Sequence, residues 1–300
     1  MRKKIYDGTL VKALDPVVFL MPFIMPRRCD SEVFVNLDLD LTKVEPFIRE
    51  MRESIPDLTL YHFVFAALAR SAFRYPQINR FIVDGGIYQR NSVKVSMMVK
   101  KERAIDGKES AIFPIIEKKD TLADIVNKCQ TLTEETFANL KGDSNDFDGL
   151  MKVLNAAPAV LTKAFVHSMF WLDGHGRLPK SLRAVQPFHS SFFVSNVGSI
   201  GLPVIFHHLY QFGTVSGFIC IGQKEWKLSM DRHGNVSKKK ILPTTFLADS
   251  RICDGYSYSC AFRAIRNCFD HPEILLQSFE EWQASQNSQD SRSSQDSRTD

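Results

Sequence analysis

The chain has 300 residues, of which 44% are hydrophobic and 11% aromatic, enough to bury a sizeable core in one large domain or two small ones. Its formal charge of +4 is too small to indicate nucleic acid or an acidic membrane surface as a partner. No run of roughly 20 uninterrupted apolar residues is present, so the sequence predicts no membrane-spanning helix.

The six cysteines are widely spaced and include no Cys-x-x-Cys pair, a pattern typical of reduced thiols and not of a zinc site. The basic N-terminus leads into Asp7-Gly8 without an apolar segment or a small-residue cleavage site, so it does not resemble an export signal. We therefore expect a cytoplasmic protein without a bound metal.

The N-terminal part is predicted to contain one strand and two helices. Prolines rule out a long uninterrupted helix in residues 1–30, which we expect to be irregular and to wrap the domain. Apolar and polar residues alternate over Val33–Leu41, which predicts a half-buried strand. Thr42 can cap a helix over Lys43–Glu53, and a largely apolar pattern predicts a buried helix over Leu60–Tyr75.

The next part is predicted to contain strands followed by a polar-faced helix. We expect strands around Arg80–Tyr88 and Val93–Val99, with a turn at Asp84–Gly86. A further strand is predicted at Ala111–Ile116, where Pro114 requires a bulge or an unpaired position. Thr121–Leu140 has the pattern of a helix.

Residues 141–149 have the composition of a linker, and an apolar, aromatic-rich helical stretch bent at Pro158 follows over Leu150–Asp173. A packed helix that covers the core or an interface explains this stretch, as do a lid, a membrane-surface helix or the wall of an acyl-chain pocket. The sequence leaves these alternatives open.

The C-terminal part is predicted to contain four strand segments and two helices. These are Ser191–Val197, Thr214–Gln223, a hairpin over Trp226–Leu242, an apolar strand leading into Asp249, a helix over Gly255–Phe269, and a short helix over Pro272–Trp282 capped by Asp270. Residues 284–300 consist almost entirely of Ser, Gln, Asp and Arg, which predicts a disordered tail. Residues 1–283 are then one mixed α/β domain, an open sheet flanked by helices.

A dense polar cluster, Asp-Ser-Arg-Ile-Cys-Asp-Gly over Asp249–Gly255, directly follows the apolar run Leu242–Ala248. It resembles the signature of the chloramphenicol acetyltransferases and of the catalytic domain of 2-oxoacid dehydrogenase acyltransferases (dihydrolipoamide acyltransferases). In that signature a His lies four residues before the Asp of Asp-Gly, and this position is Ser250 here.

Further segments resemble the dihydrolipoamide acyltransferase catalytic domain in the same order, over roughly residues 30–282. They are Leu37–Lys43, Tyr75–Asn79, Phe113–Ile116, Phe193–Gly198 and Pro272–Leu276. The strand Phe192–Ser195 and the ending Cys253–Gly255 also resemble chloramphenicol acetyltransferase. A segment of about 146–187, predicted to be helical, lies outside both patterns. The resemblance implies a chloramphenicol acetyltransferase-like fold.

The resemblance also implies a reaction in which an acyl group moves between the thiol of coenzyme A and a second thiol or a hydroxyl. Residue by residue, it implies that Ser195 is the oxyanion donor and that Asp254 is the carboxylate that anchors the catalytic turn. The general-base position is Ser250, and a neutral alcohol cannot act as a base near pH 7. Losing general-base help typically costs about 10²–10⁴-fold in rate.

A second departure from the family pattern, besides Ser250, is a missing arginine. The chloramphenicol acetyltransferases pair the anchoring Asp with an Arg near the N-terminus. The corresponding region Leu14–Phe23 contains no Arg here, so Arg2, Arg27, Arg28 or Arg251 would have to substitute. Candidates for a substitute base are His189, His207 and His208, each of which is more often a structural residue. Asp249 would serve as a base only if burial raised its pKa.

The resemblance implies coenzyme A or acyl-CoA as a substrate, a small-molecule acyl acceptor, and a homotrimer with its sites between subunits. No lipoyl domain precedes the matching region, so we expect no lipoyl group on this chain. Two alternatives remain open. One is a catalytically inactive relative that serves assembly or ligand binding. The other is a condensation-type domain, which shares the motif but normally contains two such halves.

Overall fold

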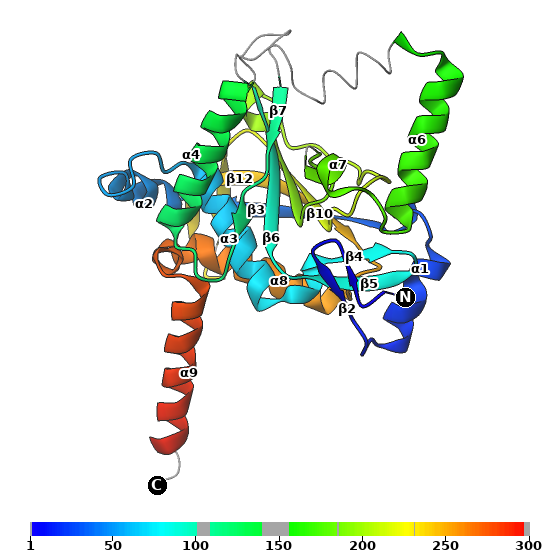
Figure 1. The fold of residues 1–300 in the computed structure, drawn as a ribbon. Coiled ribbons are helices and arrows are strands. Elements are labelled where there is room, and N and C mark those ends of the chain that lie inside the picture. Colours follow the sequence, from blue (N-terminus) through cyan, green and yellow to red (C-terminus); the bar gives the residue numbers. More distant parts are fainter. Residues whose placement is uncertain (1, 101–108, 140–155, 185, 231, 297–300) are drawn as a thin grey trace.

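A mixed β-sheet forms the centre of the fold (Figure 1). The computed structural model describes residues 2–100, 109–139, 156–184, 186–230 and 232–296 of the chain. The strand order is β11-β12-β10-β9-β6-β7, with β3 also paired to β12 and β8 to β6. β9 runs parallel to β6 and β10, and the other strand pairs described in this sheet are antiparallel. The strands are β3 (Glu32–Asp40), β6 (Val93–Lys100), β7 (Glu109–Ile112), β8 (Ile115–Ile116), β9 (Phe192–Asn196), β10 (Gly217–Ile221), β11 (Glu225–Met230) and β12 (Val236–Asp249).

A second, four-stranded sheet is formed mainly by the N-terminal strands and has its own small core. Its order is β1-β2-β5-β4, with β1 at Lys4–Ile5, β2 at Gly8–Leu10, β4 at Arg80–Val83 and β5 at Gly86–Arg90. The hairpin between β4 and β5 turns at Asp84 and Gly85, both in the left-handed region at φ 52° and 70°.

Helices cover one face of the large sheet and project from the molecule at its periphery (Figure 1). α3 (Leu60–Arg74), α4 (Leu122–Asn139) and α8 (Gly255–Asp270) pack together, whereas α6 (Ala159–Gly174) and α9 (Phe279–Asp296) extend outward. The shorter helices are α1 (Pro16–Ile24), α2 (Val44–Met51) and α7 (Lys180–Ala184), with 3₁₀ turns at Arg28–Asp30, Pro76–Asn79, Val197–Ile200 and Pro272–Leu276. None of the helices in the described ranges is long and apolar enough to cross a membrane.

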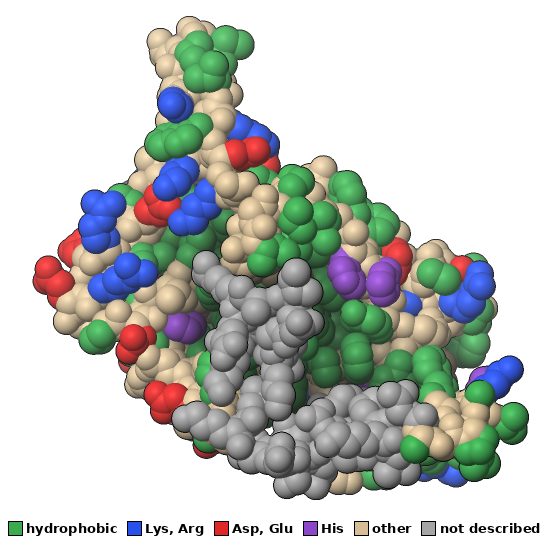
Figure 2. Space-filling view, turned by 90° about the horizontal axis from the view of Figure 1, so that it is seen from above, with side chains coloured by type: hydrophobic (Ala, Val, Ile, Leu, Met, Phe, Trp, Pro, Cys, Tyr) green, Lys and Arg blue, Asp and Glu red, His purple; other side chains and the backbone are tan. Residues whose placement is uncertain are grey.

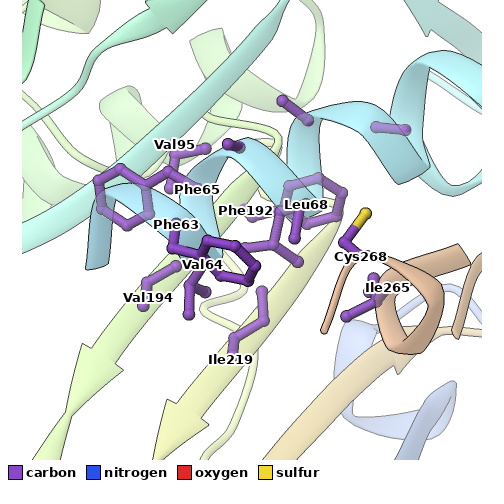
Figure 3. Close-up of a cluster of buried hydrophobic side chains, with 14 of the residues drawn as sticks. Phe63, Val64, Phe65, Leu68, Val95, Phe192, Val194, Ile219, Ile265 and Cys268 are labelled. Carbon is purple, nitrogen blue, oxygen red and sulfur yellow. The ribbon is translucent and has the colours of Figure 1, made fainter. Parts of the chain in front are cut away.

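The main core lies between the sheet and α3 and α8 (Figure 3). Every second residue of a strand faces this layer, so Val194, Ile219 and Phe246 point into it, and the ring of Phe246 packs against Tyr258 and Phe262 of α8. α3 is buried on most of its circumference because it is enclosed by the sheet, α4 and α8.

Most predicted elements are confirmed, and the differences begin in the N-terminal part of the chain. Residues 1–30 are not irregular, since they contain β1, β2 and the short helix α1, which includes Pro22. The predicted Thr42 cap is wrong, because the Thr42 hydroxyl donates to Asp40 Oδ1 and α2 begins after Lys43 without a side-chain cap. The run 80–88 is a hairpin and not one strand, and the predicted turn at Asp84–Gly86 is confirmed.

In the C-terminal region, the structure differs from the prediction in where strands and helices begin and end. The hairpin strand and the apolar strand into Asp249 are one continuous strand, β12. The last short helix is a 3₁₀ turn capped by His271 and not Asp270, and α9 then continues to Asp296, into the tail for which composition predicts disorder. That tail lacks Pro and Gly, so nothing in its sequence breaks a helix once α9 has started. The predicted linker 141–149 and residues 150–155 lie outside the described residues.

Candidate functional site

Ser250 lies in the turn directly after β12, where the backbone of a neighbouring segment holds it. Its amide nitrogen and its hydroxyl both donate to the carbonyl oxygen of Ser31, at 3.0 and 2.9 Å. The turn is thus fixed against the residue that precedes β3, the strand paired with β12. The base position of the resembling families is well defined in space, but the group it presents is a neutral alcohol.

Asp254 caps the N-terminus of α8, four residues after Ser250. Its carboxylate accepts hydrogen bonds from the amide and the hydroxyl of Ser257, at 2.8 and 3.0 Å. The amide hydrogen bond from Ser257, with the other free amides at the helix start, lowers the pKa of Asp254 below its ordinary value despite a small opposing effect of burial. Asp254 is therefore ionised near neutral pH and fixes the end of the turn.

The arginine pairing near the turn involves Asp249 and not Asp254. Arg251 Nε and Nη2 donate to Asp249 Oδ1 and Oδ2, at 2.9 and 2.7 Å, and the Ser31 hydroxyl donates to Oδ1. Burial acts to raise the pKa of Asp249, but the hydrogen bonds and charge of Arg251, with the charge of Arg28, outweigh it and lower the pKa. Asp249 is thus a buried, ionised ion-pair partner and a poor candidate for a base.

The other arginines considered as partners of Asp254 are engaged elsewhere. Arg27 pairs with Asp30, Arg28 donates to the carbonyls of Gly213 and Val215, and Arg2 donates to the carbonyl of Gly176. Within the described ranges, no salt bridge reaches Asp254. The anchoring role thus rests on the cap of α8 alone.

Ser195 is half-buried near the C-terminal end of β9, and its hydroxyl has no hydrogen-bond partner in the described part of the chain. Its strand neighbour across the sheet is Cys220 of β10, whose own partner on β12 is Thr245. These three side chains share the face of the sheet opposite to the main core. The geometry leaves the Ser195 hydroxyl free to donate to a ligand.

Ser195 and Ser250 of one chain cannot act on the same carbonyl. The register places Ser195 level with Thr245, two strands away, which corresponds to about 10 Å across the sheet. Ser250 lies five residues beyond Thr245, or about 17 Å along the strand direction. A donor and a base must both lie about 3 Å from the reacting group, so a complete site of this kind requires two copies of the chain.

His189 is buried in a polar cluster on the side of the small sheet. Its Nδ1 lies 3.2 Å from the Thr214 hydroxyl, and its Nε2 lies 3.5 Å from Asp173 Oδ1, without a hydrogen bond. Burial, with the nearby charges of Arg90 and Arg183, lowers the pKa of His189 to about 2, so the contact with Asp173 is not an ion pair. So weakly basic an imidazole is a poor general base.

His207 and His208 lie on the same face of the sheet as Ser195. The ring of His207 stacks on Phe218 at 3.9 Å between centroids, and His208 stacks on His207 at 4.5 Å. Partial burial lowers the pKa of His207, which favours the neutral imidazole, the form that a general base requires. Phe218 is two residues from Cys220, the strand neighbour of Ser195, so His207 is the best placed of the three histidines for a base in this region.

A cavity of about 300 Å³ opens beside Ser250, on the opposite face of the sheet from Ser195. It lies between β3 and α8 and is lined mostly by apolar side chains, with Ser250 at one end. Sequence reasoning did not find this cavity, nor the Asp249 pair, because both depend on segments far apart in the chain. Among the described residues, no group of three or more His, Cys, Asp or Glu side chains could hold a metal ion.

Comparison with known proteins supports the fold assignment. No protein-family model matches the sequence, and no curated protein sequence matches it significantly. Among solved structures, a probable dihydrolipoamide acetyltransferase from Listeria monocytogenes is 13% identical, with a TM-score of 0.54 over 87% of this chain and 94% of that one. Chloramphenicol acetyltransferase is 10% identical, with a TM-score of 0.50 over 87% of this chain and 98% of that one.

A dihydrolipoamide acetyltransferase from Azotobacter vinelandii is also similar, at 15% identity and a TM-score of 0.56 over 89% of this chain and 94% of that one. Crystallographic and enzymatic investigations of that protein concern the role of a serine, a histidine and an asparagine in its catalytic mechanism. The chain thus has the mixed α/β fold of dihydrolipoamide acetyltransferase catalytic cores and chloramphenicol acetyltransferase, as its motifs indicate.

Proposed function

We propose that the chain is a CoA-dependent acyltransferase-like protein, in which Ser195 of one subunit and the Ser250 turn of another form each site. The single observation that carries this proposal is where the two family motifs lie in a fold that the chain shares with known acetyltransferases. A free serine hydroxyl lies near the end of β9, and an Asp-capped helix follows the base position. The role of Ser195 would be to donate to the oxyanion of the tetrahedral intermediate.

The proposed chemistry begins with attack of a thiol or hydroxyl acceptor on the acyl carbonyl of the CoA thioester. The acceptor must lose its proton as it attacks, and Ser250 cannot take it. We therefore expect acyl transfer by this chain to be slow unless His207 or His208, from the subunit that supplies Ser195, accepts the proton. Collapse of the intermediate then releases CoA thiolate, which takes up a proton.

A homotrimer is the proposed assembly. One solved structure of similar fold is the cubic core of a pyruvate dehydrogenase multienzyme complex. In this chain, Phe34, Ile200 and Phe206 are 45%, 67% and 61% exposed around the edge of β3 and the end of β9, and Phe34 and Phe206 contact each other. Hydrophobic side chains also gather along one side of a hollow on the face seen in Figure 2. Such exposed apolar surface is typical of subunit contacts.

The test compares the chain as it stands with Ser250→His, using calorimetric titration with coenzyme A and thiol release from acetyl-CoA. We expect both proteins to bind coenzyme A and the His variant to turn over about 10²–10⁴-fold faster. Ser237→His, at an exposed position in the β11–β12 hairpin, is the matched control and should change nothing. Absence of coenzyme A binding to either protein would overturn the proposal.

A catalytically inactive relative is the second candidate. The observation that favours it is the arrangement at the turn, where the Ser250 hydroxyl is already bonded to Ser31 and the arginine pair lies on Asp249. In that case the fold serves assembly or ligand binding. Coenzyme A binding without turnover, even after Ser250→His, would favour this second candidate.

A further inference from the structure

The cavity beside Ser250 has the shape of a slot with two long walls. One wall is β3 from Val33 to Leu37, about 13 Å of strand, and the other is α8 from Gly255 to Arg266, about 16 Å of helix. The register pairs Val33 with Ala248 and Leu37 with Thr244, so the Val33 end lies at the Ser250 turn. The slot therefore leads away from Ser250.

The interior of the slot favours an aliphatic chain. Val33, Val35 and Leu37 line one wall, and Tyr258 and Phe262 line the other. Its volume of about 300 Å³ is at the lower end of the range for small-molecule sites. A hydrated polar chain would find few partners along these walls, whereas each methylene group buried there is stabilised by leaving water.

The far part of the slot carries two arginines on one face of α8. Arg263 and Arg266 are three residues apart and therefore adjacent on the helix surface. Both are exposed, and neither forms a salt bridge with any residue in the described ranges; the neighbours of the Arg263 guanidinium are the sulfur of Cys260 and the side chain of Tyr256, both of them on α8 itself. Two guanidinium groups without a carboxylate partner suit a planar anion, which they can bind through paired hydrogen bonds.

The charges at the two ends fix the orientation of an anionic ligand. The ionised Asp254 caps α8 at the Ser250 end and disfavours a second anion there. The arginines attract an anion at the other end. A ligand with one charged end would thus place that end on the arginines and its other end at Ser250.

We propose that this slot binds the transferred acyl group, an aliphatic chain of medium length that ends in a carboxylate. Its reacting carbonyl lies at Ser250, its methylene groups lie along Val33, Val35 and Phe262, and its terminal carboxylate binds Arg263 and Arg266. The assignment to the acyl group rests on the proposed acyl transfer, whereas binding of the chain itself does not require coenzyme A.

The experiment is calorimetric titration with decanoate, with 1-decanol as an uncharged analogue of similar length, and with coenzyme A. The proteins are the full chain, the double variant Arg263→Gln with Arg266→Gln, and Ser259→Phe, which places a ring in the slot from an exposed helical position. Arg49→Gln on α2 is the matched control for the loss of an arginine.

We expect decanoate to bind the full chain and the Arg49→Gln variant equally. Binding should weaken at least about tenfold in the double variant, through the loss of charge-assisted hydrogen bonds, and in Ser259→Phe, through loss of space. Decanol should respond to Ser259→Phe alone. Decanoate that fails to bind, or that binds all variants equally, would overturn the inference, whereas loss of coenzyme A binding alone would overturn only the proposed function.

Discussion

Ser195 gives the sharpest residue-scale test of the proposed chemistry, because its free hydroxyl has a single expected task. In the Ser250→His background, Ser195→Ala should lower the rate of thiol release about 10²–10³-fold, the usual cost of losing one oxyanion donor. Affinity for coenzyme A should stay the same, since the donor acts on the transition state. Ser237→Ala in the same background is the control, and a rate unaffected by Ser195→Ala would remove this residue from the mechanism.

The Asp249–Arg251 pair should matter for stability and not for chemistry. Both side chains are about 95% buried, so Arg251→Met leaves a carboxylate in the interior without its main partner. We expect the free energy of unfolding to fall by about 3–5 kcal/mol, as measured by urea denaturation. The double variant Asp249→Leu with Arg251→Met should recover most of that loss, and a double variant no more stable than Arg251→Met would contradict the explanation.

The same pair predicts the pH dependence of stability. The folded state holds the pKa of Asp249 below its ordinary value of about 3.9, since Arg251 and Arg28 outweigh the effect of burial. Its contribution is therefore fully present above about pH 4 and is lost as the pH falls through the lower, folded pKa. Asp249→Asn should unfold with a shallower dependence on pH below 4, whereas Asp38→Asn, at an exposed carboxylate, should follow the parent chain.

At the residue scale, the sequence predicted what is local and not what tertiary contact creates. Ser195 and Asp254 could be located from motifs because each depends on one strand end or one helix start. The engagement of Arg251 with Asp249 could not, because it requires the Arg28 and Ser31 segment to pack against the β12 turn. His189 illustrates the same limit, since only its burial shows that its pKa is too low for a base.

At the element scale, the loop after β9 depends on a close backbone approach that only glycine allows. A Cβ atom at Gly198 would lie 2.2 Å from the carbonyl oxygen of Gly222. Gly198→Ala should therefore displace this loop, lower stability by about 1–3 kcal/mol and disturb the neighbouring Ser195. Gly174→Ala at the end of α6, where a Cβ meets nothing within 4 Å, should be nearly neutral in the same thermal unfolding assay. Equal effects would refute the steric argument.

Periodicity predicted the buried elements well, because their apolar residues repeat along the sequence with the spacing of the side chains that face the core. α3, α4, α8 and β3 lie within a few residues of their expected ranges. Prediction failed where an element is short or peripheral. α1 contains a proline that suggested irregular chain, and α9 extends through a polar composition that offers no core-facing pattern. The N-cap of the last turn was also misplaced: Asp270 is still the last residue of α8, so the N-cap position falls on His271, which makes no side-chain cap hydrogen bond.

At the scale of the whole molecule, the proposed acyl transfer predicts assembly, because Ser195 and Ser250 lie too far apart within one chain to share a site. A chain of 34.2 kDa should elute and scatter light as a trimer, with three times that mass. Exposed apolar residues near β3 and the β9 end would be covered in that trimer. A monomer at micromolar concentration would contradict both the assembly and the shared site.

Complementation between two inactive chains gives the decisive test of the shared site. The double variant Ser250→His with Ser195→Ala has a base but no donor, whereas the parent chain has a donor but no base. Each alone should release thiol from acetyl-CoA slowly. Co-expressed, they form mixed trimers in which some interfaces combine the base of one chain with the donor of the other, so activity should rise well above the sum of the two. If instead the donor and base act within one chain, mixing restores nothing, because no chain carries both.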